Sequence, residues 1–145
     1  MSLGRILIAE DNGLNQYLLK SILKKRGYEI TLANDGAEAL DFACRADFDL
    51  ILTDVHMPHM TGVEFARALK IAETPNNAIP IIAITADCDD DLRYECLAAG
   101  IWDVTYKPID REKLFAMVAS YLNRDGEEKL TVHKPAQLAP HIEDI

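Results

Sequence analysis

The sequence predicts an α/β domain built on a five-stranded parallel sheet with helices on both faces. Short apolar runs of strand length alternate along the 145 residues with segments in which apolar residues recur at helical spacing, the pattern of repeated strand–helix units. The run Leu50–Asp54 is almost continuously apolar, as expected for a central strand buried on both faces. The length suits one domain, and 49% hydrophobic and 27% charged residues are ordinary for a globular protein.

The first two strand–helix units occupy the N-terminal third of the chain. Strand Arg5–Ala9 precedes a helix that ends at Gly27, because glycine commonly follows the last helical turn. Strand Glu29–Ala33 leads through an Asn-Asp-Gly turn to a helix over Ala37–Ala46. The residues expected to face inward are Leu14, Leu18, Leu19, Ile22 and Leu23 in the first helix and Ala39, Leu40, Ala43 and Cys44 in the second.

Three further units follow the same pattern. They are strand Leu50–Asp54 with a helix after Gly62, strand Ile81–Thr85 with a helix that Asp89-Asp90-Asp91 opens and Gly100 ends, and strand Val104–Tyr106 with a helix over Arg111–Leu122. The acids at the start of the fourth helix are favoured there by the helix dipole. Pro75-Asn76-Asn77 breaks the chain before the fourth strand. The expected inward residues are Phe65, Ala66 and Leu69 in the third helix and Leu114, Phe115, Val118 and Leu122 in the last.

Right-handed crossovers between five such units produce a doubly wound sheet with the flavodoxin-like order 2-1-3-4-5. We therefore expect one domain over residues 5–123. Residues 124–145 carry many charges, only scattered apolar residues and no periodicity. That texture predicts a linker or a disordered tail.

Charge and composition disfavour several classes of protein. The formal net charge of −9 argues against nucleic acid as a partner, because binding phosphates requires Lys and Arg. No apolar run approaches the ~18 residues of a membrane span and no secretory signal is seen, so we expect a cytoplasmic protein without a membrane segment. The three cysteines (Cys44, Cys88 and Cys96) fit no metal-binding spacing and predict reduced thiols.

Polar side chains stand at the ends of four predicted strands: Glu10 and Asp11 after the first, Asp54 in the third, Thr85 in the fourth and Lys107 after the fifth. The carboxyl ends of parallel strands meet at one edge, so these side chains are expected to converge. Two carboxylates at ~4 Å repel by roughly 4 kcal/mol at an effective dielectric near 20, so a divalent cation is expected among them. Oxygen ligands with retained waters suit Mg²⁺, and no Cys or His cluster suits zinc.

The same residues suit the transfer of a phosphoryl group. That chemistry depends on positioning and on neutralising the charge of the phosphoryl oxygens. Lys107 and the Thr85 hydroxyl, with nearby backbone N–H groups, can bind those oxygens beside the metal. Asp54 is left as the nucleophile that forms an acyl phosphate.

Four segments resemble the receiver domain of two-component response regulators, in order and spacing over residues 5–123. They are Ile6–Asn12, Leu52–Gly62, Ile84-Thr85-Ala86 and Tyr106-Lys107-Pro108, and the stretch Glu95–Ile109 is most similar to receivers of hybrid histidine kinases. The resemblance implies that a histidine kinase or a histidine phosphotransfer domain donates a phosphoryl group from phosphohistidine to Asp54. It also implies that the module catalyses only its own phosphorylation and dephosphorylation and is not an enzyme acting on an external substrate.

The resemblance further implies roles for single residues. Mg²⁺, for which Mn²⁺ can substitute, is held by Asp11, Asp54 and the backbone carbonyl of His56, with Glu10 acting mostly through water. The other implied roles are phosphoryl binding for Thr85, Lys107 and Ala86, tuning of phosphoryl loss for His56 and Asp87, and structural support for Gly62 and for Pro108 through a cis peptide bond.

One position departs from the family's pattern. The aromatic residue usually found three positions before the lysine is replaced by Val104, which cannot make the ring rotation that accompanies phosphorylation. Tyr106, on the same strand face, is a candidate replacement. The family's partner surface corresponds to about Asp89–Leu122, which is also a candidate homodimer face, and the pair Ile101-Trp102 is expected to form an exposed apolar patch near it.

Three other functions fit the fold less well. A Mg²⁺-dependent phosphatase with an aspartyl nucleophile wants a second acid two residues after Asp54, where this chain has His56. A nucleotide or flavin binder is disfavoured because the sequence has neither a GxGxxG nor a P-loop lysine motif. An interaction domain that is not phosphorylated has no need of the complete set of acids, threonine and lysine. His56 and His59 also suggest a metal pair, but hard cations do not require imidazole.

Overall fold

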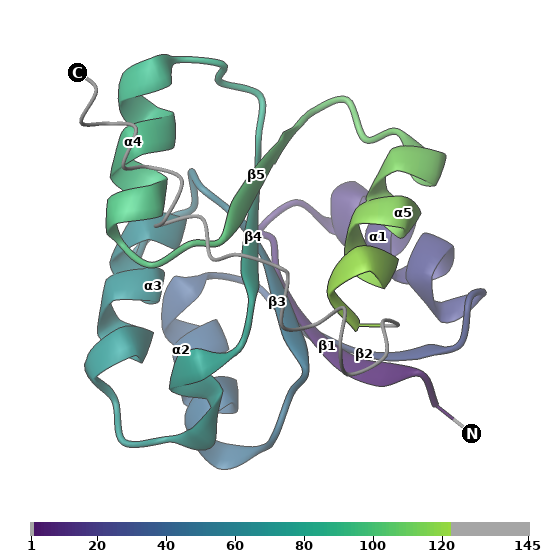
Figure 1. Cartoon of the computed structure of the whole chain (residues 1–145), viewed down its shortest axis with the longest axis horizontal. Helices are drawn as coiled ribbons and strands as arrows, with labels where there is room; N and C mark the ends of the chain where they lie inside the picture. Colours follow the sequence, from purple (N-terminus) through teal and green to yellow (C-terminus); the bar gives the residue numbers. More distant parts are fainter. Residues whose placement is uncertain (1, 123–145) are drawn as a thin grey trace.

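The computed structural model describes residues 2–122, which form one sheet of five parallel strands in the order β2-β1-β3-β4-β5 (Figure 1). The predicted fold class and strand order are therefore confirmed. The predicted tail over residues 124–145 lies outside the described residues. The elements are β1 Gly4–Ala9, α1 Gly13–Lys24, β2 Tyr28–Ala33, α2 Gly36–Arg45, β3 Leu50–Asp54, α3 Gly62–Ile71, the 3-10 helix η1 Pro75–Ala78, β4 Ile81–Thr85, α4 Asp90–Ala98, β5 Asp103–Tyr106 and α5 Arg111–Leu122.

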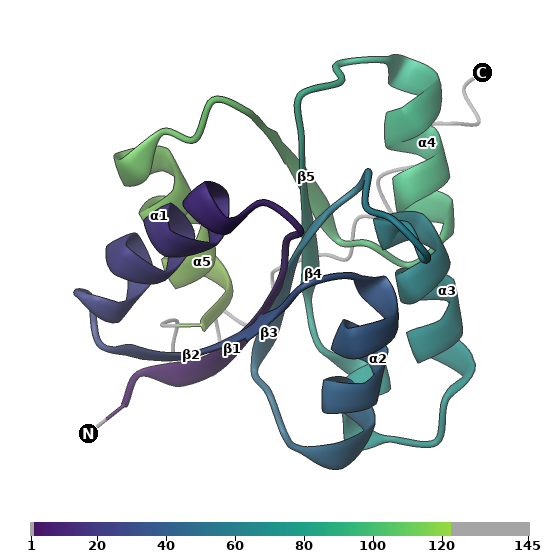
Figure 2. The same cartoon turned by 180° about the vertical axis from the view of Figure 1, so that it is seen from behind.

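Two hydrophobic cores lie on opposite faces of the sheet. Helices α1 and α5 cover one face, and α2, α3 and α4 cover the other, as Figure 2 shows from behind. Because side chains alternate along a strand, β1 sends Ile6 and Ile8 into the first core and Leu7 and Ala9 into the second. Strand β3 is buried along its whole length, as its apolar sequence predicts. Among the described helices, none combines the length and apolar composition that a membrane span requires.

Two inward-facing residues were predicted wrongly. Leu14 is 75% exposed because nine residues, about two and a half helical turns, separate it from the buried Leu23, which places the two on opposite sides of α1. Cys44 is exposed because the inner face of α2 is made by Ala39 and Ala43. The stripes predicted for α3 and α5 are confirmed, since their members are buried or packed against a core.

The predicted exposed patch at Ile101-Trp102 is also wrong. Gly100 adopts a left-handed φ of 103°, and the Ile101 N–H then donates to the carbonyl of Cys96, which turns the Ile101 side chain into the core. Trp102 is half-buried and packs edge-to-face on Tyr121 of α5, with ring centroids 5.9 Å apart. Ile101 therefore packs in the core, and Trp102 packs against α5.

The break predicted at Pro75-Asn76-Asn77 is a 3-10 helix with a buried asparagine at its centre. The Asn76 side chain accepts from the Phe48 N–H at 3.0 Å and donates to the carbonyls of Ala43 and Ala46, each at 2.6 Å. Those two carbonyls belong to the end of α2, where the helix provides no partner of its own. Asn76 thus closes the end of the sheet opposite the acidic residues.

Candidate metal and phosphoryl-acceptor site

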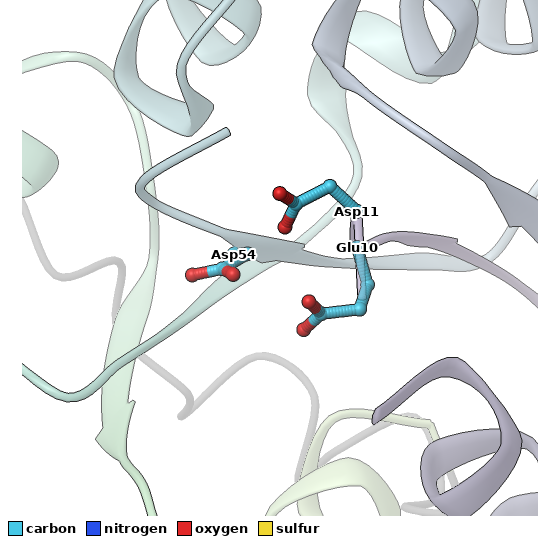
Figure 3. Close-up of side chains that lie close together, drawn as sticks. All are labelled: Glu10, Asp11 and Asp54. Carbon is cyan, nitrogen blue, oxygen red and sulfur yellow. The ribbon is translucent and has the colours of Figure 1, made fainter. Parts of the chain in front are cut away.

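Three carboxylates gather at the carboxyl edge of the sheet, as predicted (Figure 3). Glu10 and Asp11 follow β1, and Asp54 ends β3. These strands are hydrogen-bonded neighbours, with Ala9 opposite Thr53. Oxygen atoms of all three carboxylates lie within 4.8 Å of one another. Glu10 and Asp54 are buried, at 1% and 7% exposure, whereas Asp11 is exposed.

Lys107 reaches into this cluster from the end of β5. Its Nζ lies 3.1 Å from Oδ2 of Asp54 and 3.6 Å from Oε1 of Glu10. Burial alone lowers the pKa of Lys107, but the hydrogen bond to Asp54 and the charges of Asp54 and Glu10 outweigh it and raise the pKa. The peptide bond between Lys107 and Pro108 is cis, as predicted.

The cluster carries more negative charge than Lys107 neutralises. Three ionised carboxylates and one ammonium leave a formal charge of −2. Burial raises the pKa of Glu10, and the Asp54 charge adds to that rise, although the Asn12 N–H and Lys107 act against it. An all-oxygen donor set with surplus negative charge fits a hard divalent cation. The residues present therefore suit Mg²⁺.

The β3–α3 loop follows directly from Asp54. The His56 side chain is exposed, and its Nε2 lies 3.9 Å from Oδ2 of Asp87 across the edge of the site. Helix α3 starts against this loop, because the Gly62 N–H donates to the Val55 carbonyl at 2.9 Å. A Cβ at Gly62 would collide with the carbonyl oxygen of Asp54. This close contact explains why position 62, next to the site, requires a glycine.

His59 belongs to a different contact. Its Nδ1 lies 3.2 Å from Oδ2 of Asp35, the N-cap of α2, and not among the carboxylates. The pKa of Asp35 is lowered mainly by the hydrogen bond from the Glu38 N–H, and the hydrogen bond with His59 makes the next largest contribution. The one cluster of candidate metal ligands found among residues 2–122 consists of carboxylates alone, which disfavours a histidine site.

Thr85 ends β4, the strand hydrogen-bonded to β3, so it lies at the same edge of the sheet as Asp54. Thr85 is buried, its carbonyl accepts from the Lys107 N–H at 2.8 Å, and its Oγ1 accepts from the Asp87 N–H at 3.0 Å. Ala86, between them, is exposed. Lys107 and Thr85 are therefore connected through the backbone as well as by position.

Val104 and Tyr106 project toward the same core, the one covered by α3 and α4. Val104 is 6% exposed and lies opposite Ala83, while the half-buried Tyr106 lies opposite Thr85. Tyr106 is thus the aromatic neighbour of Thr85 on β5.

Two side chains near the site were not anticipated. Gln16 donates to the Glu10 carbonyl at 2.6 Å and to Oδ1 of Asn34 at 2.9 Å. Gln16 lies on α1 and Asn34 ends the segment after β2, so only the folded chain brings them together. The one feature of the sequence that points to Gln16 is its position, a polar residue next to the apolar positions of the first helix.

Comparison with known proteins identifies a matching family and many relatives. The response regulator receiver domain family matches residues 6–119. Hybrid signal transduction histidine kinase I of Dictyostelium discoideum is 37% identical over 130 residues, covering 86% of this chain and 8% of the kinase. The aerobic respiration control sensor protein ArcB of Escherichia coli is 33% identical over 127 residues, covering 88% of this chain and 16% of the sensor. The chain therefore spans less than a fifth of these relatives.

Solved structures agree with the fold. The receiver domain of a sensor histidine kinase from Pseudomonas aeruginosa, with a magnesium ion coordinated in its active-site cleft, has a TM-score of 0.77 and 34% identity, covering 83% of this chain and 98% of that one. The chemotaxis protein CheY4 of Vibrio cholerae has a TM-score of 0.75 and 32% identity, covering 81% and 96%.

Proposed function

Because this chain belongs to the response regulator receiver domain family, we propose that Asp54 is its phosphoryl acceptor and that Mg²⁺ is its cofactor. The chain is a phosphoacceptor switch of the two-component type. The observation that supports the choice of Asp54 is its contact with Lys107 at 3.1 Å, inside a cluster that also holds Glu10 and Asp11. Mn²⁺ is expected to substitute for Mg²⁺, since it accepts the same oxygen ligands.

The proposed reaction transfers a phosphoryl group from a histidine nitrogen to a carboxylate oxygen. An Asp54 Oδ atom attacks phosphorus, the N–P bond of the donor breaks, and its electron pair returns to the imidazole, which takes up a proton. Asp11, Asp54 and the His56 carbonyl would hold Mg²⁺, with Glu10 acting mostly through water, and the bound ion would neutralise charge on the phosphoryl oxygens. Lys107, the Thr85 hydroxyl and the Ala86 N–H are proposed to bind the remaining phosphoryl oxygens.

Dephosphorylation is proposed to use the same site. Water attacks the acyl phosphate at phosphorus, which releases inorganic phosphate and restores the Asp54 carboxylate. His56 and Asp87 are exposed and lie 3.9 Å apart, each two residues after the end of a strand that carries a site residue, Asp54 and Thr85 respectively. We assign His56 and Asp87 to tuning the rate of this hydrolysis.

The proposed donor is a histidine kinase or a histidine phosphotransfer domain, in keeping with the hybrid kinases among the relatives. A protein donor covers the rim of the site when its phosphorus approaches Asp54. Leu14 and Tyr17, at 75% and 71% exposure, are the large exposed apolar side chains of α1, the helix that follows Asp11. Alanine at both positions is expected to slow transfer from the protein donor about tenfold, as for interface residues worth more than 1 kcal/mol, with acetyl phosphate as the control donor.

The remaining features of the proposal concern the whole protein. We propose that residues 5–123 are the functional unit, that residues 124–145 are a linker or disordered tail, and that the setting is cytoplasmic. The face made by α4, β5 and α5 is proposed as the partner and homodimer surface, where Tyr94 is 53% exposed. We assign no activity on an external substrate, and the phosphatase alternative is disfavoured by His56 at the position of its second acid.

One experiment tests the proposal. The protein is incubated with acetyl phosphate and Mg²⁺, and the intact mass is measured for the wild type, Asp54→Ala and Asp47→Ala, the last an exposed acid outside the carboxylate cluster. We expect one phosphoryl adduct in the wild type and in Asp47→Ala, and none in Asp54→Ala. An adduct that survives Asp54→Ala would refute the assignment, and steady turnover of a soluble phosphoester would favour the phosphatase.

A further inference from the structure

The turn that carries Glu10 and Asp11 is supported by a chain of side-chain hydrogen bonds from two helices. Gln16 of α1 donates through Nε2 to the carbonyl oxygen of Glu10 at 2.6 Å and to Oδ1 of Asn34 at 2.9 Å. Glu38 of α2 fixes Asn34, because its Oε1 accepts from the Asn34 backbone N–H at 2.6 Å and from Nδ2 at 3.0 Å. The contacts therefore run from α2 to the backbone of the acidic turn.

The chemistry of this chain of contacts specifies an amide at position 16. The Asn34 amide has one orientation, since its Nδ2 must face the Glu38 carboxylate and its Oδ1 must then face Gln16. The Gln16 Nε2 carries two hydrogens, and both face oxygen acceptors. A glutamate at this position would oppose oxygen with oxygen, and an aliphatic side chain would donate to neither acceptor.

The carbonyl that Gln16 holds belongs to the peptide group between Glu10 and Asp11. That group is planar, so fixing its carbonyl also fixes the direction in which the Asp11 Cα leaves the strand. The preceding N–H, that of Glu10, is held by the Ala33 carbonyl at 3.0 Å. The Glu10 N–H is thus attached to the last residue of β2, and the Glu10 carbonyl is attached to Gln16 of α1 and, through it, to Asn34 directly after β2.

Asp11 depends on this backbone more than the other two acids do. The Glu10 carboxylate accepts from the Asn12 N–H at 3.1 Å and faces Lys107, and the Asp54 carboxylate contacts Lys107 directly. Within residues 2–122, the exposed Asp11 carboxylate has no hydrogen bond or ion pair of its own. Its position beside the other carboxylates is therefore determined through its main chain.

We propose that Gln16 is a positioning residue for the metal, holding the peptide group between Glu10 and Asp11 so that the Asp11 carboxylate faces Asp54. Asn34 and Glu38 orient Gln16 for this role. The inference rests on the proposed function, since it assigns a further residue to the same Mg²⁺ site. Gln16 itself contacts neither the metal nor the phosphoryl group.

The test measures Mg²⁺ binding by calorimetry, without any phosphoryl donor, for the wild type, Gln16→Met and Lys24→Met. Lys24 is an exposed residue in the last turn of α1 and serves as the matched control. We expect Gln16→Met to weaken Mg²⁺ binding about tenfold, as removal of an outer partner of a metal ligand does, and Lys24→Met to leave binding unchanged. Phosphorylation by acetyl phosphate should remain at the wild-type rate in Lys24→Met.

Two further measurements separate positioning from general support of the fold. Gln16→Glu keeps the length of the side chain but removes the donors, and it should weaken Mg²⁺ binding at least as much as Gln16→Met. Urea unfolding in EDTA reports stability without metal. Unchanged Mg²⁺ affinity in both folded variants would overturn the inference, including when they are less stable in EDTA. A wild-type protein that binds no Mg²⁺ would instead overturn the proposed function itself.

Discussion

Replacing Asp11 by asparagine should stabilise the metal-free protein. The Asp11 carboxylate lies within 4.8 Å of the carboxylates of both Glu10 and Asp54, and no ion pair within the described residues compensates it. Because Asp11 is exposed, a water-like dielectric of about 80 is appropriate, and each repulsion then costs about 0.9 kcal/mol. The two pairs together give about 1–2 kcal/mol, well below the roughly 3.5 kcal/mol for each pair at a dielectric near 20.

Adding Mg²⁺ should reverse the order of stability. A ligand that binds only the folded state stabilises it by about 2.7 kcal/mol at a concentration 100 times its Kd. The wild type should show a gain of this kind, whereas Asp11→Asn, which has lost a charged metal ligand, should show little. The assay is equilibrium urea unfolding of both proteins in EDTA and in excess Mg²⁺ at low ionic strength. Asp11→Asn should unfold at a higher urea concentration than the wild type in EDTA, and at a lower urea concentration than the wild type in Mg²⁺.

Asp47→Asn provides the control for this prediction. Asp47 is exposed and lies in the α2–β3 connection, outside the carboxylate cluster, so the same change in side chain should have little effect in either buffer. Two results would refute the reasoning. A less stable Asp11→Asn protein in EDTA would contradict the repulsion, and an undiminished gain with Mg²⁺ would contradict the role of Asp11 as a ligand.

Three further predictions follow from the site. Because the pKa of Glu10 is raised, the folded protein binds that proton more tightly than the unfolded chain, so metal-free stability should rise as pH is lowered from neutral toward that raised pKa. Urea unfolding in EDTA across this range should show the slope in the wild type and lose it in Glu10→Gln; a fall over this range would contradict it. Gly62→Ala should lower the free energy of unfolding by about 1–3 kcal/mol, because its Cβ would collide with the Asp54 carbonyl. Gly13→Ala, with open space around the added Cβ, should not lower the free energy of unfolding. If urea unfolding showed the same loss of stability in both variants, the steric argument would be rejected. Tyr106→Ala should leave phosphorylation intact but diminish the NMR chemical-shift changes that phosphorylation causes on α4, and an undiminished α4 response would discard Tyr106 as the replacement aromatic.

The strands and the acidic cluster could be predicted because both depend on short stretches of chain. A run such as Leu50–Asp54 is apolar enough to identify a buried strand, and the parallel sheet then brings Glu10, Asp11 and Asp54 to one edge. Lys107 could be placed for the same reason, since it follows the fifth strand directly. These predictions required the strand order but no knowledge of side-chain packing.

The errors arose where burial depends on an element's neighbours. Leu14 is an apolar residue in an amphipathic helix, yet it lies opposite the buried Leu23, and its exposure suits contact with a partner better than packing. Ile101 is expected from the sequence to form an exposed patch with Trp102, but the turn at Gly100 directs it into the core. The role of Gln16 could not be predicted from the sequence because its partners, Glu10 and Asn34, lie in other segments of the chain.

Lys107 connects the acidic site to the edge of the sheet. Its Nζ is shared by Asp54 and Glu10, at 3.1 and 3.6 Å, while its backbone N–H donates to the Thr85 carbonyl at 2.8 Å. A phosphoryl group on Asp54 would add anionic oxygens that compete for the same ammonium, so Nζ would have to shift toward them. Through its backbone contact, such a shift acts on Thr85, which lies opposite Tyr106. The buried Val104 side chain, two pairs earlier, has no polar atom, whereas Tyr106 is paired with Thr85. We therefore propose Tyr106 as the side chain on β5 that responds to phosphorylation of Asp54.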